Sequence, residues 1–251
     1  MGEPSVFIVS DNADSLGLQT AKLLQARAIW VEVIDPYALA DCRVTISDDF
    51  FYVNDRLVGG VLFRTSPDSA FSAGFVAEDQ AYSDSEVRAI WLAALNSQSV
   101  LGINRYDAVA WFEGSRWTLW RRRLMAAGIE VAEFTFGDSG NGWWYPYCSV
   151  IPQEDLDSLT CRVLGGARVR DEVYRSNLMV CDHIMPECPD THLRQAFRIL
   201  REHGISVAEI MSDSASRIIA VNTQPDISNP ECLNIAAQLI ATAYETHFTA
   251  R

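Results

Sequence analysis

The sequence predicts an α/β protein of two lobes, with a parallel sheet in the N-terminal lobe and a smaller C-terminal lobe of α+β type. Residues 5–10, SVFIVS, are an apolar run that is followed by a helical pattern and a second apolar run. This β-α-β order is typical of a parallel sheet with a right-handed crossover. Residues 137–158 then break the periodicity with glycines, prolines and aromatic side chains, which indicates a linker. The expected domains are therefore 1–136, the linker 137–158, and 159–251.

The N-terminal lobe begins with a strand, a helix and a second strand. Leu16, Thr20 and Leu24 fall on one helical face between the two apolar runs. The loop before this helix lacks the three-glycine phosphate fingerprint, because Gly17 stands alone, so a dinucleotide site is not expected there. Asn54-Asp55 predicts a hairpin turn further along. Arg64 ends the next apolar run, and we expect it to form a salt bridge with a local acid.

Two more helices are expected before the linker. Ser83 and Glu86 have capping-box spacing, which predicts a helix that begins at Ser83. Residues 99–105 read as a strand. A further helix over 116–127 would end at Gly128, and residues 128–136 would form another strand.

The C-terminal lobe shows a second alternation of strands and helices. Gly165-Gly166 indicates a hairpin between two strands. Asp190 can cap a helix whose apolar residues repeat at helical spacing, and two strands over 205–213 and 217–222 follow. Asn229, with proline next to it, can cap the last helix.

The bulk composition bounds the class of protein. The chain has 251 residues, 49% of them hydrophobic and 21% charged, which suffices for a substantial core. A net charge of −13 argues against a nucleic-acid partner, since it would repel a phosphate backbone. No apolar run can span a bilayer, and the N-terminus lacks the basic region of a signal peptide, so we expect no membrane association and a cytoplasmic location. Six dispersed cysteines are expected to be reduced.

The C-terminal lobe carries the candidate site. A strand with Arg162 and a segment with Arg175 and Asn177 precede a strand with Glu209 and a strand that ends at Asn222. Arginines can hold phosphate oxygens, and carboxylate and amide oxygens are ligands of hard cations. We therefore consider the three former residues candidate anion or acceptor contacts, and the two latter weak candidates for metal binding.

This order of residues resembles the ATP-grasp superfamily, in particular its branch of peptide and amino-acid ligases, which includes RimK-like enzymes and the ring-forming ligases of microviridin-type peptides. The resemblance implies an ATP-grasp fold, a pre-ATP-grasp domain in the first lobe, and ATP and Mg²⁺ as cofactors. The residues that carry it are Arg162, Arg175, Ser176, Asn177, Glu209, Asn222 and Pro225.

Three departures from the family pattern matter for function. Ala220 stands where the family has its second metal-binding acid, and Mg²⁺ demands near-complete octahedral ligation. The linker 137–158 stands where the family inserts a small nucleotide-clamping lobe with a lysine. Lys22, far away in the first helix, is the only lysine of the chain. The sequence thus predicts a truncated, degenerate member that binds ATP and Mg²⁺ only if a partner completes the site.

Three functions remain open from the sequence. The first is a binding or accessory protein in peptide or amino-acid modification, whose cleft, with Trp143, Trp144 and Asp226 as candidate lining residues, takes a peptide, an amino-acid-like molecule or a partner enzyme. The second is an ATP-grasp-type ligase or a related enzyme that uses the retained half site. The third is a scaffold in which Arg175 and Glu209 form a salt bridge. A homodimer is a further expectation, as a way to cover apolar surface.

Overall fold

The computed structural model describes residues 4–47, 50–64, 77–97, 99–105, 117–132, 175–187 and 190–250. The chain forms two compact units that are not consecutive in sequence. Unit 1 comprises Met1–Gly114, His203–Val207 and Asp226–Arg251, and unit 2 comprises Ser115–Glu202 and Ala208–Pro225. One unit holds a largely parallel sheet and the other an antiparallel sheet, which confirms the predicted α/β class. The expected linker, 137–158, lies outside the described residues, so the predicted domain boundary stays a prediction.

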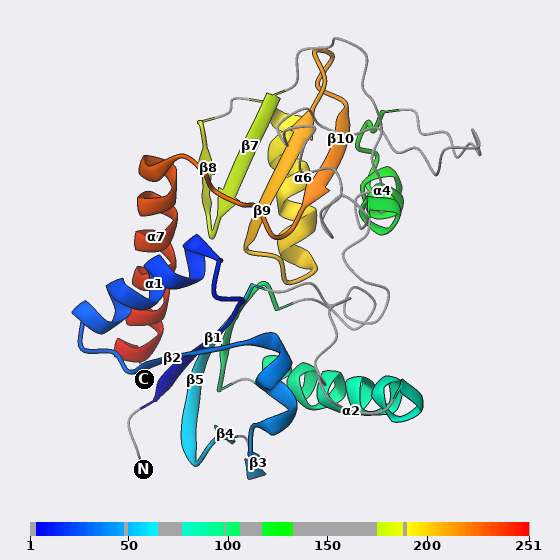
Figure 1. Ribbon diagram of the computed structural model, residues 1–251. Helices are drawn as coiled ribbons and strands as arrows, with labels where there is room; N and C mark the ends of the chain where they lie inside the picture. Colours follow the sequence, from blue (N-terminus) through cyan, green and yellow to red (C-terminus); the bar gives the residue numbers. More distant parts are fainter. Residues whose placement is uncertain are drawn as a thin grey trace. The chain divides into compact units, whose positions relative to one another are not determined.

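Unit 1 is built on a six-stranded sheet in the order β2-β1-β5-β4-β3, with β6 also paired to β5 (Figure 1). β1 is parallel to β2 and to β5, and β5 is parallel to β6. β3 and β4 extend the sheet as antiparallel strands. The strands are β1 (Ser5–Val9), β2 (Val31–Ile34), β3 (Val44–Ser47), β4 (Phe50–Val53), β5 (Arg56–Phe63) and β6 (Leu101–Ile103).

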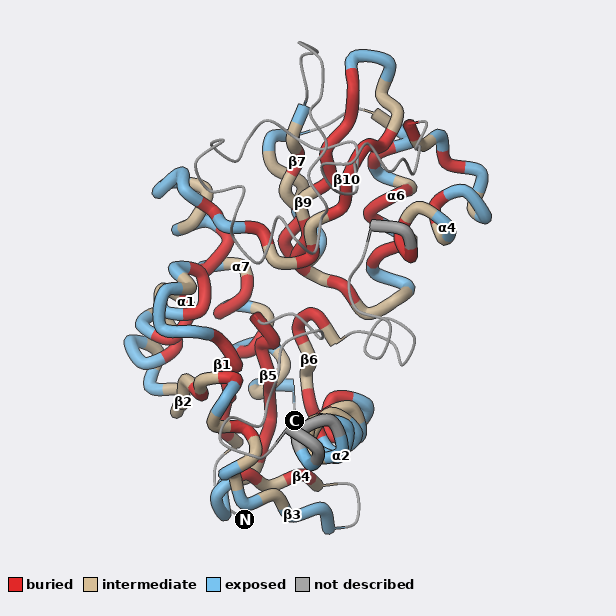
Figure 2. The backbone as a smooth tube through the Cα atoms, turned by 45° about the vertical axis from the view of Figure 1, so that its right-hand side comes forward, coloured by how far each residue is buried: buried red, intermediate tan, exposed pale blue. Residues whose placement is uncertain are grey.

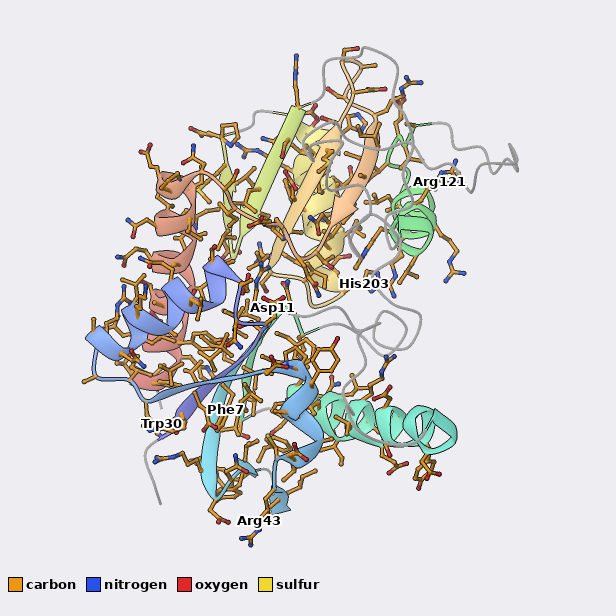
Figure 3. All side chains as sticks on the ribbon, viewed as in Figure 1. Phe7, Asp11, Trp30, Arg43, Arg121 and His203 are labelled. Atoms are coloured by element: carbon orange, nitrogen blue, oxygen red, sulfur yellow. The ribbon has the colours of Figure 1, made fainter. Side chains whose placement is uncertain are left out.

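The predicted β-α-β opening is confirmed. β1 has all five residues buried, as expected for a strand covered on both faces. Helix α1 (Ser15–Ala26) connects β1 to β2, and the Asp14 carboxylate caps it by accepting a hydrogen bond from Gly17 N at 2.8 Å. Trp30, just before β2, contacts the ring of Phe7 at a centroid distance of 5.7 Å (Figure 3).

Helices cover both faces of this sheet. Helix α7 (Pro230–Thr249) packs along α1, and its Tyr244 lies over Gly60 of β5. A Cβ atom at Gly60 would come within 2.6 Å of Tyr244 Cδ1, so only glycine allows the helix to lie this close. Helix α2 (Ala77–Asn96) covers the opposite face, where its Trp91 meets Phe51 edge-on at 5.9 Å.

The predicted start of α2 is wrong. The helix begins at Ala77, so Ser83 lies inside it and caps nothing. A serine followed three residues later by glutamate also occurs within helices, and the preceding residues AEDQAY include strong helix formers. Capping-box spacing alone therefore placed the helix start too late.

The predicted hairpin at Asn54-Asp55 is confirmed. Both residues have positive φ, 50° and 65°, and they join β4 to β5. Such left-handed pairs match the twist of a two-residue hairpin, and Asn and Asp tolerate this conformation better than most residues. A short 3-10 helix, η1 (Pro36–Asp41), precedes β3 and is capped by the Asp35 side chain.

Unit 2 is built on a four-stranded antiparallel sheet in the order β10-β9-β7-β8, with α6 across one face (Figure 1). Asp190 accepts from His192 N at 2.8 Å and so caps α6 as predicted. The buried stripe of α6 is the predicted one, namely Leu193, Ala196, Phe197 and Leu200 (Figure 2). The elements are α4 (Trp117–Ala126), β7 (Arg175–Val180), β8 (His183–Met185), α6 (Thr191–Glu202), β9 (Val207–Ser212) and β10 (Ile218–Asn222).

Two segments of unit 2 differ from expectation. The sequence did not predict β8, which turns back on β7 through Cys181 with a φ of 53°. Within the predicted strand 128–136, the described residues form only one isolated bridge, between Val131 and Ile218. The hairpin at Gly165-Gly166 lies outside the described residues. Among the described helices, none is both long and apolar enough to cross a membrane.

Candidate functional site

Three strands of unit 2 bring a carboxylate, a hydroxyl and an amide together. Glu209 of β9 lies directly opposite Asn222 of β10 in the antiparallel ladder. β7 is the other neighbour of β9, and the Ser176 hydroxyl donates a hydrogen bond to Glu209 Oε1. Asn222 also contributes a side-chain hydrogen bond to Glu209. We call Ser176, Glu209 and Asn222 the carboxylate cluster.

Burial controls the electrostatics of this cluster. It raises the pKa of Glu209 above its ordinary value, because a charged carboxylate loses solvation there. The hydrogen bonds from Ser176 and Asn222 lower that pKa in part. No ion pair of Glu209 occurs among the described residues, so both of its partners there are neutral.

Ala220 lies on the same face of β10 as Asn222, because side chains two residues apart point to the same side of a strand. Its partner across the ladder is Met211 of β9, which follows Glu209 at the same spacing. Ala220 is 5% exposed and Met211 is 3% exposed. The surface beside the carboxylate cluster is therefore a buried methyl group and a thioether, neither of which is a ligand for a hard cation.

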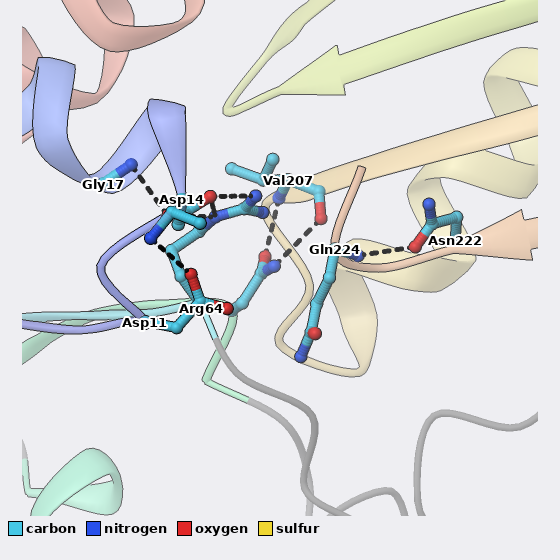
Figure 4. A network of polar contacts seen from close by, with 9 residues as sticks. Asp11, Asp14, Gly17, Arg64, Val207, Asn222 and Gln224 are labelled. Carbon is cyan, nitrogen blue, oxygen red and sulfur yellow. Dashed lines mark hydrogen bonds and ion pairs between the residues drawn. The ribbon is translucent and has the colours of Figure 1, made fainter. Parts of the chain in front are cut away.

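The residues present do not fit the magnesium pair of an ATP-grasp ligase. The cluster supplies one carboxylate, and one oxygen of that carboxylate already accepts from Ser176. Asn222 Oδ1 already accepts from Gln224 N at 2.9 Å (Figure 4). Within the described part of the chain, no three His, Cys, Asp or Glu side chains gather closely enough to hold a metal ion. Mg²⁺ needs near-ideal octahedral oxygen ligation, which this set does not approach.

The other candidate residues lie apart from the cluster or outside the description. Arg175 is exposed at the start of β7 and forms no ion pair with Glu209, so the salt bridge of the scaffold hypothesis is absent. Asn177 is 5% exposed, and its Nδ2 donates to Pro186 O at 3.2 Å. Asp226 is exposed and belongs to unit 1. Arg162, Trp143 and Trp144 lie outside the described residues, so their roles stay predictions.

Asn104 is a residue that the sequence did not reveal as important. It follows β6 with a φ of 55°, it is fully buried, and its Oδ1 accepts from Ser206 N at 2.9 Å and Val207 N at 2.7 Å. Its Nδ2 donates to Val207 O at 3.0 Å (Figure 4). The Asn104 amide thus anchors the first residue of β9, the strand that carries Glu209. An asparagine directly after a short strand was the one available signal.

Arg64 forms the salt bridge that the sequence predicted. Its Nη2 lies 2.7 Å and its Nε 3.1 Å from the two carboxylate oxygens of Asp14, the residue that caps α1 (Figure 4). The side chains are 3% and 11% exposed. A paired, two-point geometry of this kind satisfies a buried arginine, so this pair is explained by the fold of unit 1.

Comparison with known proteins identifies the fold. No family model matches the chain, and no curated protein matches its sequence. Among solved structures, the ATP-grasp ligase PsnB in complex with precursor peptide PsnA2 and AMPPNP aligns over 99% of both chains, with a TM-score of 0.66 and 14% identity. The macrocyclase MdnC bound to precursor peptide MdnA from Microcystis aeruginosa MRC aligns over 97% of this chain and 99% of its own, with a TM-score of 0.63 and 11% identity.

A third similar structure has a broader description. A RimK domain ATP-grasp protein from Sphaerobacter thermophilus DSM 20745 aligns over 95% of this chain and 98% of its own, with a TM-score of 0.52 and 16% identity. At these identities the likeness establishes the fold. The chain therefore has the ATP-grasp fold that the sequence motifs predicted, with peptide-modifying ligases among its structural neighbours.

Proposed function

We propose that this ATP-grasp-fold chain is a peptide-binding accessory protein in a peptide-modification pathway, and that it does not ligate with ATP by itself. The observation that carries the proposal is the carboxylate cluster, whose single carboxylate faces Ala220 and Met211 in place of a second acid. A ligase of this fold needs several oxygen donors around its magnesium ions, because the metal neutralises the phosphate charge.

The structural neighbours support the peptide part of the proposal. Two of them were solved with a precursor peptide bound, PsnB with PsnA2 and MdnC with MdnA. Their fold extends over nearly the full length of this chain. A fold alone does not define a ligand, but a chain that keeps the fold while its metal ligands are lost has peptide binding as its simplest remaining role.

The distribution of lysine supports the loss of nucleotide binding. Lys22 on α1 is the only lysine of the chain, and it belongs to unit 1. Unit 2, which carries the cluster, contains no lysine in its sequence. Arginine carries the charge but not the compact reach of a phosphate-binding lysine.

The test is calorimetric titration of the full chain with ATP and MgCl₂, in parallel with peptides translated from short reading frames beside its gene. We expect no heat of nucleotide binding at millimolar ATP and saturable binding of one such peptide. Magnesium-dependent ATP binding at micromolar concentration would overturn the accessory role. Failure of every encoded peptide to bind would overturn the peptide role.

A second candidate is a ligase half site that another chain completes, and the exposed Arg175 at the start of β7 favours it. An exposed guanidinium beside the cluster is suited to a phosphate or carboxylate group. ATP hydrolysis by a mixture with an ATP-grasp ligase from the same genome would separate the two candidates. A rate above that of the ligase alone, lost in Arg175→Met and kept in Arg198→Met on α6, would favour the completed half site.

A further inference from the structure

We propose that the carboxylate cluster binds the side-chain ammonium of a lysine residue in the peptide partner, in the place where related ligases hold metal. This inference rests on the proposed peptide-binding function. It assigns to Glu209 the cation contact, and to Ser176 and Asn222 the positioning of its carboxylate.

Charge is the first argument. Glu209 is half-buried on β9, and its described partners are the neutral Ser176 hydroxyl and Asn222 amide. A carboxylate that loses solvation without a cationic partner is destabilised in its charged form, and burial accordingly raises its pKa. A single positive charge from a ligand would compensate it. One carboxylate matches one ammonium, whereas it leaves Mg²⁺ undercoordinated and with excess charge.

Hydrogen-bonding capacity is the second argument. The Ser176 hydroxyl donates to Glu209 and keeps its oxygen lone pairs as acceptors, while the Glu209 carboxylate keeps most of its acceptor positions. Asn222 Oδ1 accepts one bond, from Gln224 N, and a carbonyl oxygen can accept two. The cluster thus offers acceptors on three side chains, which suits the three donors of a lysine ammonium.

The same geometry disfavours arginine. A guanidinium binds a carboxylate best through two parallel bonds to both oxygens. Ser176 already donates to Glu209 Oε1, and Asn222 donates to the same carboxylate, so a two-point approach would displace one of these donors. A compact ammonium needs no such flat approach, and it is therefore the cation that the cluster fits.

The charge of the whole chain is the third argument. With a net charge of −13, the protein attracts a basic peptide and repels an acidic one. Its own Lys22 is exposed on α1 of unit 1, so unit 2 has no internal lysine to fill the cluster. Charge complementarity therefore commits the occupant to a lysine of another molecule.

The experiment compares three short synthetic peptides that differ at one position, which holds lysine, Nε-acetyl-lysine or norleucine in a glycine-alanine context. Binding is followed by amide chemical shifts of the full chain. We expect saturable shifts at β7, β9 and β10 with the lysine peptide, and at least tenfold weaker binding of the two uncharged peptides, the loss expected when a buried charge pair is not formed.

Variants locate the contact. Glu209→Gln is expected to reduce lysine-peptide binding at least tenfold while it stays folded, and Glu202→Gln, an exposed glutamate on α6, is expected to bind like the parent chain. Equal binding of the lysine and norleucine peptides would overturn the inference, as would equal binding by Glu209→Gln. Competition by millimolar MgCl₂ in the absence of ATP would also overturn it, by showing a metal site. These outcomes are independent of the ATP titration, whose failure would overturn the proposed function instead.

Discussion

Unit 1 and unit 2 each bury a carboxylate, and they treat it in opposite ways. In unit 1, Asp14 is paired with the Arg64 guanidinium at 2.7 Å and also caps α1. In unit 2, Glu209 has only the neutral Ser176 and Asn222 as described partners. A paired buried charge is stable because each ion replaces the solvation that the other has lost, while an unpaired one remains costly.

The difference separates structural charges from candidate binding charges. The Asp14 carboxylate is compensated inside the fold and needs no ligand. Glu209 gains a compensating charge only from another molecule, since its described partners carry none. Functional sites tend to keep such unfavourable groups, and the contrast therefore points to unit 2 as the binding unit.

Arg64→Met should give the largest effect, because it breaks the compensated pair. The substitution leaves Asp14 largely buried without its cation, and we expect the free energy of unfolding to fall by about 3 kcal/mol in urea denaturation. Arg43→Met is the matched control, since its pair with Asp55 is about 70% exposed on both sides and should contribute little. Equal effects of the two substitutions would contradict the structural role of Arg64.

Ala220→Glu tests the unpaired side of the comparison by adding a second carboxylate next to Glu209. We expect the free energy of unfolding to fall by about 2 kcal/mol without divalent cations, because two like charges would share a desolvated face. Millimolar MgCl₂ should restore part of this loss. Ala220→Gln has a similar size without the charge, and a Mg²⁺ response in this control would contradict the explanation.

Asn104→Ala tests a buried polar group that is neutral and fully bonded. It removes acceptors from Ser206 N and Val207 N, and alanine disfavours the positive φ at this position, so we expect a loss of about 2 kcal/mol. Hydrogen exchange at the Val207 amide should accelerate accordingly. Asn104→Gly keeps the backbone conformation accessible and removes the amide, so unchanged exchange in this variant would rule out the clamp.

Glu209→Gln should give the smallest effect, and in the opposite direction. Because the folded state raises the pKa of Glu209 above 4.5, the folded protein binds a proton more tightly than the unfolded chain does. The stability contributed by this group is therefore present at low pH and is lost as the pH rises from about 4.5 through the folded pKa.

The glutamine variant lacks this titration. We expect it to be slightly more stable than the parent at pH 7, by up to about 2 °C in Tm, and about equally stable at pH 4. Thermal unfolding between these pH values measures the difference. A variant that is less stable than the parent at pH 7 would show that the carboxylate is already compensated.

Much of the candidate site could be named from the sequence, but not its internal contacts. Glu209 and Asn222 were paired as metal candidates because of a motif resemblance, and the structure places them opposite each other. Ser176 was part of the same motif, yet its bond to Glu209 depends on β7 lying next to β9. The expected Arg175 to Glu209 salt bridge does not form, since Arg175 is exposed at the end of its strand. Strand order, which no local pattern contains, decided both outcomes.

The sequence by itself determined the features that depend on neighbouring residues. These include the caps Asp190 and Asn229, the turn at Asn54-Asp55 and the apolar stripe of α6, because side chains a few residues apart meet on a helix or in a turn. The start of α2 is the local prediction that failed, since its spacing also occurs inside helices.

Only the tertiary structure decided which distant side chains meet. Asn104 clamps Val207 across more than a hundred residues of chain, Arg64 finds Asp14, and Ala220 lies against Met211 beside Glu209. Such contacts follow from sheet topology and register, because pairing brings together residues whose sequence separation carries no periodic signal. The alanine at position 220 was visible in the sequence, but the buried, apolar surroundings that make the site unsuited to Mg²⁺ emerged only from the fold.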